Sequence, residues 1–187
     1  MARALVILAL LVWPFAVLAQ GTAAEETALQ RAMQKDPERF SGRVTDLIAG
    51  FGGPEGLTLA GIDEHIALER AGARASTLRR FLAMDLDADG AVDRTELQVS
   101  QRAANSEGRG RMERQFLAAD ADGDGQADAA ELAEQGRLAG LRALGEDEAG
   151  YLRGLMVLDA DGNGALTGAE VARAVMTQER AGQEKAG

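Results

Sequence analysis

The chain has 187 residues, a formal net charge of −10 and no cysteine. This length suits one domain or two small lobes. Its excess of acidic residues, 30 against 20 basic ones, argues against nucleic acid as a partner. The lack of cysteine excludes disulfides, cysteine nucleophiles and zinc sites of the Cys/His type. Aromatic residues make up only 4%, so we expect a thin core whose stability depends on something that binds the folded state.

Residues 1–19 have the features of a signal peptide. Arg3 provides the positive charge, residues 4–18 form an apolar run of 15, and Ala19 precedes a suitable cleavage point. The run is shorter than the roughly 20 residues that a membrane-spanning helix needs, and an uncleaved anchor is the alternative interpretation. We therefore predict a periplasmic or secreted protein with no stable membrane span after cleavage. Arginine supplies 18 of the 20 basic residues, a composition associated with GC-rich bacterial sources.

Residues 20–37 are polar and rich in alanine, and we interpret them as a frayed helix or a tether. Asp36 and Pro37 form a helix-start signal, because aspartate can cap a helix and proline fits its first turn. Apolar residues then recur with helical spacing, which predicts a helix that ends at the glycines following it. These residues are Phe40, Val44, Leu47, Ile48 and Phe51.

A twelve-residue pattern occurs three times, at residues 85–96, 120–131 and 159–170. Each copy has aspartate at positions one and three, aspartate or asparagine at position five, glycine at position six and glutamate at position twelve. Calcium takes about six to eight oxygen ligands in tolerant geometry. Alternating carboxylates on a chain that turns sharply at a glycine supply such ligands. The three stretches therefore predict three Ca²⁺ ions.

The predicted ligands stand at positions one, three, five, seven, nine and twelve, and position seven contributes only its backbone carbonyl. They are Asp85, Asp87, Asp89, Ala91, Asp93 and Glu96 in the first loop, Asp120, Asp122, Asp124, Gln126, Asp128 and Glu131 in the second, and Asp159, Asp161, Asn163, Ala165, Thr167 and Glu170 in the third. The third loop has fewer carboxylates and neutralises a divalent ion less completely. In the first two loops the carboxylates repel one another without an ion, so we expect the ion-free protein to be loosened.

Residues 52–63 have the layout of a fourth loop without its ligands. If Leu59 stands at position eight, the loop starts are 33, 35 and 39 residues apart, which indicates an internal repeat. Positions three and five would then be Pro54 and Gly56, which offer no carboxylate. We interpret this segment as a degenerate unit that pairs structurally and binds no metal. An ordinary helical hairpin is the alternative.

Position eight carries the residue that pairs with a partner loop, and Val92, Ala127 and Leu166 occupy it in the three loops. We expect pairing in sequence order, with the degenerate unit joined to the first loop through Leu59 and Val92. The predicted organisation is a lobe at 38–104, a linker at 105–110, a second lobe at 111–178 that pairs the second and third loops, and a disordered tail at 179–187.

The three loops, with apolar helices predicted on both sides of each, resemble the EF-hand calcium-binding family. The layout of four units is similar to that of calmodulin-like proteins, and the resemblance covers roughly residues 38–178. It implies an all-α fold of helix-loop-helix repeats in two paired lobes, with short β-ladders between paired loops. The signal peptide is a departure from cytosolic members of the family and favours an exported bacterial type.

Two functions fit these sequence features. The first is a calcium-stabilised binding or buffering module outside the cytoplasm, which suits the signal peptide and the thin core. The second is a calcium sensor that exposes an apolar groove to a protein partner. Four methionines are candidates to line such a groove, although filling the core is the simpler role for them: Met84, Met112, Met156 and Met176. No enzyme is expected, because no nucleophile–base pair, phosphate loop or transition-metal cluster is evident.

Overall fold

The computed structural model describes residues 20–186, so the predicted signal peptide at 1–19 lies outside the described residues. Within this range the helices are α1 (Gln20–Lys35), α2 (Pro37–Phe51), α3 (Leu59–Leu82), α4 (Arg94–Arg102), α5 (Ser106–Ala119), α6 (Ala129–Ala143), α7 (Glu146–Gly154) and α8 (Gly168–Ala186), with a 3-10 turn η1 (Leu155–Leu158). The strands are β1 (Leu57–Thr58), β2 (Val92–Asp93), β3 (Gln126–Ala127) and β4 (Ala165–Leu166). None of these helices is long and apolar enough to cross a bilayer.

The loops meet in two pairs through short antiparallel ladders. β2 pairs with β3, which places Val92 opposite Ala127, and β1 pairs with β4, which places Leu57 opposite Leu166. The first and second loops therefore form an inner pair, and the degenerate unit and the third loop form an outer pair. The predicted all-α fold with paired loops is confirmed, but the predicted order of pairing is wrong.

The length of α3 explains why the pairs are nested. This helix runs without a break over 24 residues from the degenerate unit to the first loop, a length of about 36 Å at a rise of about 1.5 Å per residue. The two loops at its ends therefore cannot meet. Only residues 103–105 separate α4 from α5, so the first and second loops fold back on each other.

The predicted boundaries change accordingly. The expected linker at 105–110 is the start of α5, where the Asn105 side chain caps the helix by accepting a hydrogen bond from the Gly108 N–H at 2.8 Å. The expected lobes at 38–104 and 111–178 are wrong, because each loop pair combines segments from both ranges. The polar segment at 20–37 forms α1 and the first residue of α2, and α8 continues through most of the expected disordered tail to Ala186.

The degenerate unit has a different register from the expected one. Leu57, not Leu59, faces position eight of the partner loop, and the Thr58 side chain caps α3 by accepting a hydrogen bond from the Gly61 N–H at 3.2 Å. Leu57 is the sixth residue after the end of α2, whereas Leu166 is the eighth after the end of η1. The degenerate loop is thus two residues shorter than its partner over the segment that carries positions one to five in a complete loop.

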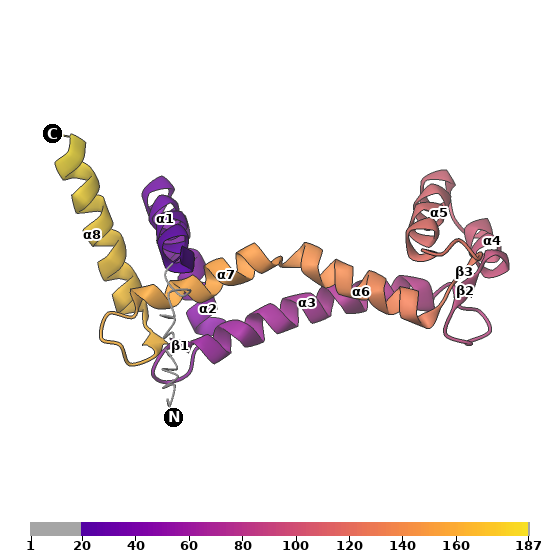
Figure 1. The fold of residues 1–187 in the computed structure, drawn as a ribbon, viewed down its shortest axis with the longest axis horizontal. Coiled ribbons are helices and arrows are strands. Elements are labelled where there is room, and N and C mark those ends of the chain that lie inside the picture. Colours follow the sequence, from indigo (N-terminus) through magenta and orange to yellow (C-terminus); the bar gives the residue numbers. More distant parts are fainter. Residues whose placement is uncertain (1–19, 187) are drawn as a thin grey trace, which may run out of the picture.

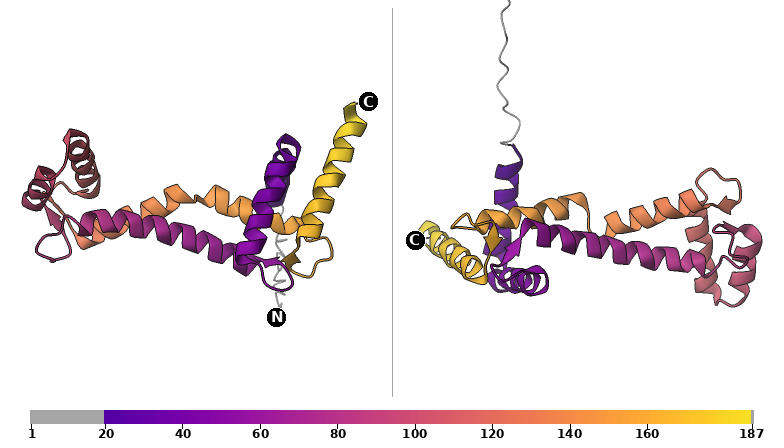
Figure 2. Two further views of the ribbon diagram at one scale, coloured as in Figure 1. Left: turned by 180° about the vertical axis from the view of Figure 1, so that it is seen from behind. Right: turned by 90° about the horizontal axis from the view of Figure 1, so that it is seen from below.

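The helices α3 and α6 lie side by side and antiparallel, and they connect the two loop pairs (Figure 1 and Figure 2). Their close approach depends on a residue without a side chain, because a Cβ at Gly140 would lie 3.2 Å from the Arg70 carbonyl oxygen. The molecule is elongated as a result. The inner pair lies at one end with α4 and α5, and the outer pair lies at the other end with α1, α2, α7 and α8.

Each end has its own hydrophobic core. The inner core consists of Phe81, Met84, Val92, Leu97, Phe116, Ala119, Ala127 and Leu132. The outer core consists of Leu29, Met33, Phe40, Val44, Leu47, Leu57, Ile62, Ile66, Leu144, Ala149, Leu155, Leu166 and Val171. The outer core includes two residues of α1, Leu29 and Met33, so this helix is an integral part of that end.

The nested pairing predicts a specific glycine requirement in the degenerate unit. Gly56 has a φ of 124°, and a Cβ there would lie 2.6 Å from the carbonyl oxygen of Leu166 on the partner strand. Gly56→Ala should therefore lower the free energy of unfolding by about 2–3 kcal/mol, measured by urea denaturation. Gly53→Ala is the matched control, because nothing lies within 4 Å of a Cβ at Gly53. Equal stability of the two variants would contradict the pairing of β1 with β4.

Candidate metal centres

Each of the three loops gathers three carboxylates at one point. The groups are Asp85, Asp87 and Glu96 in the first loop, Asp120, Asp122 and Glu131 in the second, and Asp159, Asp161 and Glu170 in the third. Within each group the ligand atoms lie within 4.8 Å of one another. The structure thus brings together the predicted residues of positions one, three and twelve in every loop.

The aspartate at position one fixes the sharp turn of each loop. Its Oδ2 accepts a hydrogen bond from the backbone N–H of the glycine at position six, at 3.1 Å for Asp85, 3.2 Å for Asp120 and 2.8 Å for Asp159. These three glycines have φ values of 82° to 92°, a conformation that costs little only for glycine. The sequence pattern therefore predicts this turn correctly.

The second oxygen of this aspartate distinguishes the inner pair from the third loop. In the first two loops the Oδ1 atoms of Asp85 and Asp120 are buried and have no hydrogen-bond partner among the described residues. In the third loop, Oδ1 of Asp159 accepts a hydrogen bond from the Gly162 N–H at 2.9 Å. A buried carboxylate oxygen without a partner is unfavourable, and a cation in the loop would remove that cost.

The glutamate at position twelve closes the loop over its own start. In the first loop, Glu96 accepts hydrogen bonds from the Leu86 N–H at 2.6 Å and from the Asp93 N–H at 2.9 Å, one at each oxygen. Glu131 and Glu170 make the equivalent contacts in the other two loops. The helix that follows each loop is therefore held against the residues that precede the turn, with both carboxylate oxygens facing the loop.

Glu170 is the most deeply buried of these glutamates, with a relative exposure of 6%. The backbone N–H of Thr167 is the main cause of a lowered pKa, and the Thr167 hydroxyl, which donates to Oε2 at 2.8 Å, adds to it. The pKa of Glu170 falls to about 2. The side chain is therefore ionised at any pH at which the protein is expected to work, as a cation ligand must be.

The side chains at positions three and five stabilise the turn by accepting hydrogen bonds from backbone N–H groups of the same loop. Asp87 accepts a hydrogen bond from the Asp89 N–H at 3.1 Å, and Asp89 accepts one from the Ala91 N–H at 2.8 Å. The second loop repeats both contacts, through Asp122 and Asp124. In the third loop Asn163 takes the place of the second aspartate and accepts from the Ala165 N–H at 2.8 Å. The role of the backbone carbonyls of position seven as ligands stays a prediction; these carbonyls belong to Ala91, Gln126 and Ala165.

Position nine has a second role, which its place in the ligand pattern does not predict. Asp93 and Asp128 cap α4 and α6 by accepting hydrogen bonds from the backbone N–H of Glu96 and Glu131, at 2.8 Å and 2.9 Å. Aspartate followed three residues later by glutamate is the sequence signature of a capping box, so the signal was present. These two aspartates therefore start a helix in addition to facing the loop.

Position four also carries a backbone constraint that the twelve-residue pattern does not specify. Its residue has a left-handed backbone in all three loops, with φ values of 62° at Ala88, 75° at Gly123 and 71° at Gly162. Alanine in this conformation is strained, by about 1 kcal/mol relative to glycine. The first loop thus carries local strain that the other two loops avoid.

The donor set of each loop consists only of oxygen atoms, which suits a hard divalent cation, and the flexible ring of carboxylates suits calcium better than magnesium. The unpaired oxygens of Asp85 and Asp120 fit such an ion at the centre of the first two loops. The third loop fits it less closely, because Asp159 has both oxygens occupied by hydrogen bonds and position five is a neutral asparagine.

The strain at position four gives a paired prediction. Ala88→Gly should raise the free energy of unfolding by about 0.5–1 kcal/mol, because it removes the strained alanine. Gly123→Ala should lower it by about 1 kcal/mol, although nothing lies within 4 Å of the added Cβ. Thermal unfolding in saturating calcium measures both effects. Changes of the same sign in the two variants would contradict the shared loop geometry.

The comparisons with known proteins agree with this geometry. The family model of the EF hand matches residues 78–99 and 112–134, which contain the first and second loops. Comparisons with curated proteins and with solved structures found no significant match. The two matched segments are thus similar to the EF-hand family, and the helix-loop-helix units with their short antiparallel strand pairs fit an EF-hand fold.

Proposed function

We propose that this protein binds three Ca²⁺ ions, one in each loop, and that the ions stabilise it as an exported binding or buffering module. The observation that carries the proposal is the repetition of one acidic cluster in three loops with the same internal hydrogen bonds. The first and second loops have the stronger support, since each also matches the family model and holds a buried carboxylate oxygen without a partner.

The positions of the methionines support a module rather than a sensor. Met84 is 2% exposed within the inner core, and Met112 packs against that core. Met156 packs against the outer core, and among the four candidates only Met176 is exposed, at 54%. Three of the four methionines thus fill cores, which leaves little of the methionine-lined groove that a sensor would use.

The export of this module is part of the proposal and rests on the sequence alone. Residues 1–19 have the charge and apolar run of a signal peptide, but they lie outside the described residues. Extracellular calcium modules function with weak sites, with dissociation constants of about 10⁻⁴ to 10⁻³ M. The less complete third loop is compatible with such an affinity. No catalytic role is part of the proposal.

A calcium sensor is the second candidate, and one observation favours it. Apolar side chains near the inner pair are exposed, among them Leu82 at 63%, Leu86 at 55% and Leu117 at 53%. Such side chains are available to a protein partner without any opening of the core. A sensor also needs an exposed apolar surface that changes with calcium, so the experiment that separates the two candidates measures whether calcium increases that surface.

The number of ions can be tested by calorimetric titration of the protein with calcium. We expect three ions per chain, and we expect each of Glu96→Gln, Glu131→Gln and Glu170→Gln to remove one of them, because a neutral amide cannot supply two charged oxygens. Glu107→Gln is the matched control, since this exposed residue of α5 lies outside the three clusters. A wild-type protein that binds no calcium at millimolar concentration would contradict the proposal.

The effect of calcium removal tests the role of the ions. A site at a free calcium concentration of one hundred times its dissociation constant contributes about 2.7 kcal/mol. Three such sites correspond to a rise in Tm on the order of 15–30 °C for a chain of this size, so chelator should lower Tm by that amount. A hydrophobic dye read in parallel should stay flat or fall when calcium is added. A rise in dye fluorescence would favour the sensor instead.

A further inference from the structure

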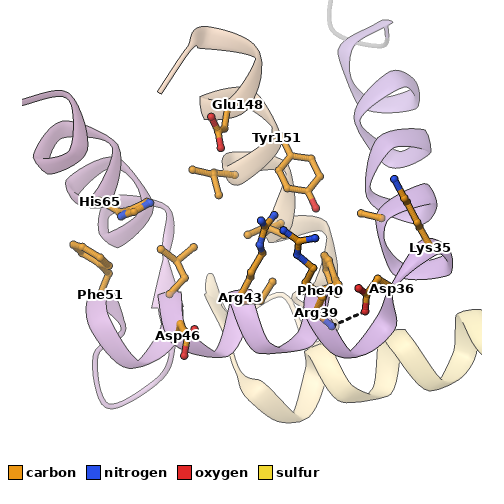
Figure 3. A pocket seen from close by; sticks show the side chains of 15 residues that line it. Lys35, Asp36, Arg39, Phe40, Arg43, Asp46, Phe51, His65, Glu148 and Tyr151 are labelled. Carbon is orange, nitrogen blue, oxygen red and sulfur yellow. Dashed lines mark hydrogen bonds between the residues drawn. The ribbon is translucent and has the colours of Figure 1, made fainter. Parts of the chain in front are cut away.

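A cavity of about 710 Å³ lies away from the three loops, between α1, α2, α3 and α7 (Figure 3). Its volume falls within the range of about 300–1,000 Å³ that small-molecule sites occupy. Aliphatic and aromatic side chains form much of its lining: Phe40, Val44, Leu47, Leu152 and Leu155. The cavity thus offers an apolar surface to a ligand, although no predicted calcium ligand contributes to it.

Three cationic side chains, Lys35, Arg39 and Arg43, stand at the rim of this cavity. Arg39 and Arg43 are one helical turn apart on α2, and in Figure 3 their guanidinium groups point toward the hydroxyl of Tyr151 on α7. None of the three cations forms an ion pair with a described side chain. In a chain with a net charge of −10, such a group of unpaired cations beside an apolar cavity favours an anionic ligand.

The acidic residues around the cavity favour an anion with one negative charge over an anion with two. Three acidic residues, Asp36, Asp46 and Glu148, also contribute to the lining and balance the three cations. Asp36 is already engaged, because its side chain accepts a hydrogen bond from the Arg39 backbone N–H at 3.0 Å. A dianion would meet more repulsion from these carboxylates than a monoanion, so a carboxylate fits the rim better than a phosphate.

Tyr151 adds a neutral hydrogen-bond donor next to the cations. Burial raises the pKa of its hydroxyl above the usual value, and the positive charge of Arg43 offsets part of this rise. The hydroxyl therefore keeps its proton at neutral pH. Together, two planar guanidinium groups and one hydroxyl are suited to the oxygens of a single carboxylate.

We propose that this cavity binds an aliphatic monocarboxylate with a single chain, whose carboxylate lies between Arg39, Arg43 and Tyr151 and whose chain covers the apolar lining. The helix α1 forms one wall of the site through Ala32 and Lys35, and its buried residues Leu29 and Met33 anchor that wall in the outer core. This binding activity is separate from the calcium loops and does not depend on the function proposed for them.

Calorimetric titration of the calcium-loaded protein with sodium decanoate tests the proposal, at calcium concentrations that keep the carboxylate soluble. We expect one decanoate per chain and no binding of decyltrimethylammonium, which has a similar chain and the opposite charge. The double variant Arg39→Gln/Arg43→Gln should bind decanoate at least about tenfold more weakly, because it loses both charge-assisted contacts. Circular dichroism verifies that the variant is folded, as expected for exposed side chains.

The matched control is Arg109→Gln, which removes one exposed arginine of α5 that does not line the cavity. Its affinity for decanoate should equal that of the wild-type protein. Three results would each overturn the proposal: no binding of decanoate to the folded wild-type protein, equal binding of decyltrimethylammonium, or unchanged binding to the double variant. Binding of decyl phosphate at least about tenfold more tightly than decanoate would overturn the choice of a monocarboxylate.

Discussion

The uninterrupted helix α3 is the constraint on which the arrangement of the molecule depends. A helix of 24 residues keeps the degenerate unit and the first loop about 36 Å apart, and each loop must then find a partner elsewhere. The short connection between α4 and α5 provides one partner, and the return of the chain along α6 and α7 provides the other. Gly140 allows that return, since it lets α6 approach the backbone of α3 closely.

Within each loop the same hydrogen bonds hold the carboxylates near one another. Backbone N–H groups donate to the aspartates of positions one, three and five and to the glutamate of position twelve. These contacts offset part of the repulsion between the carboxylates, but they leave Oδ1 of Asp85 and Asp120 without a partner. In the inner pair the loop backbone is therefore well hydrogen-bonded, while one buried carboxylate oxygen in each loop lacks a partner. A divalent cation would provide that partner.

The sequence predicts the structural features that depend on residues close together in the chain, but it does not predict how the loops pair. The twelve-residue pattern specifies turns, helix starts and carboxylate clusters, because each of these depends on residues close together in the chain. Loop pairing depends on whether the helices between loops are continuous. That signal was weak but present, since the stretch forming α3 contains no proline and only two glycines, Gly61 in its first turn and Gly72. The pairing register at Leu57 could not be predicted from the sequence, because a shortened loop without ligand residues offers no recognisable position from which to number the loop.

The two ends of the molecule differ in what stabilises them. The outer core is the larger one and includes residues of α1, whereas the inner core is small and contains two alanines, Ala119 and Ala127. The inner end also depends on α4, a helix of nine residues, which is too short to be stable by itself. Arg94 supports it by lying over the Phe116 ring, with 4.5 Å between its guanidinium carbon and the ring centroid, and by pairing with Glu113.

These partly exposed contacts of Arg94 contribute only modestly to stability. The inner end has two complete acidic loops and few apolar contacts, so its folding should be the more strongly coupled to calcium. The outer end has one loop of lower charge and a larger core. We therefore expect it to be the part that keeps its shape, and the cavity between its helices, when calcium is scarce.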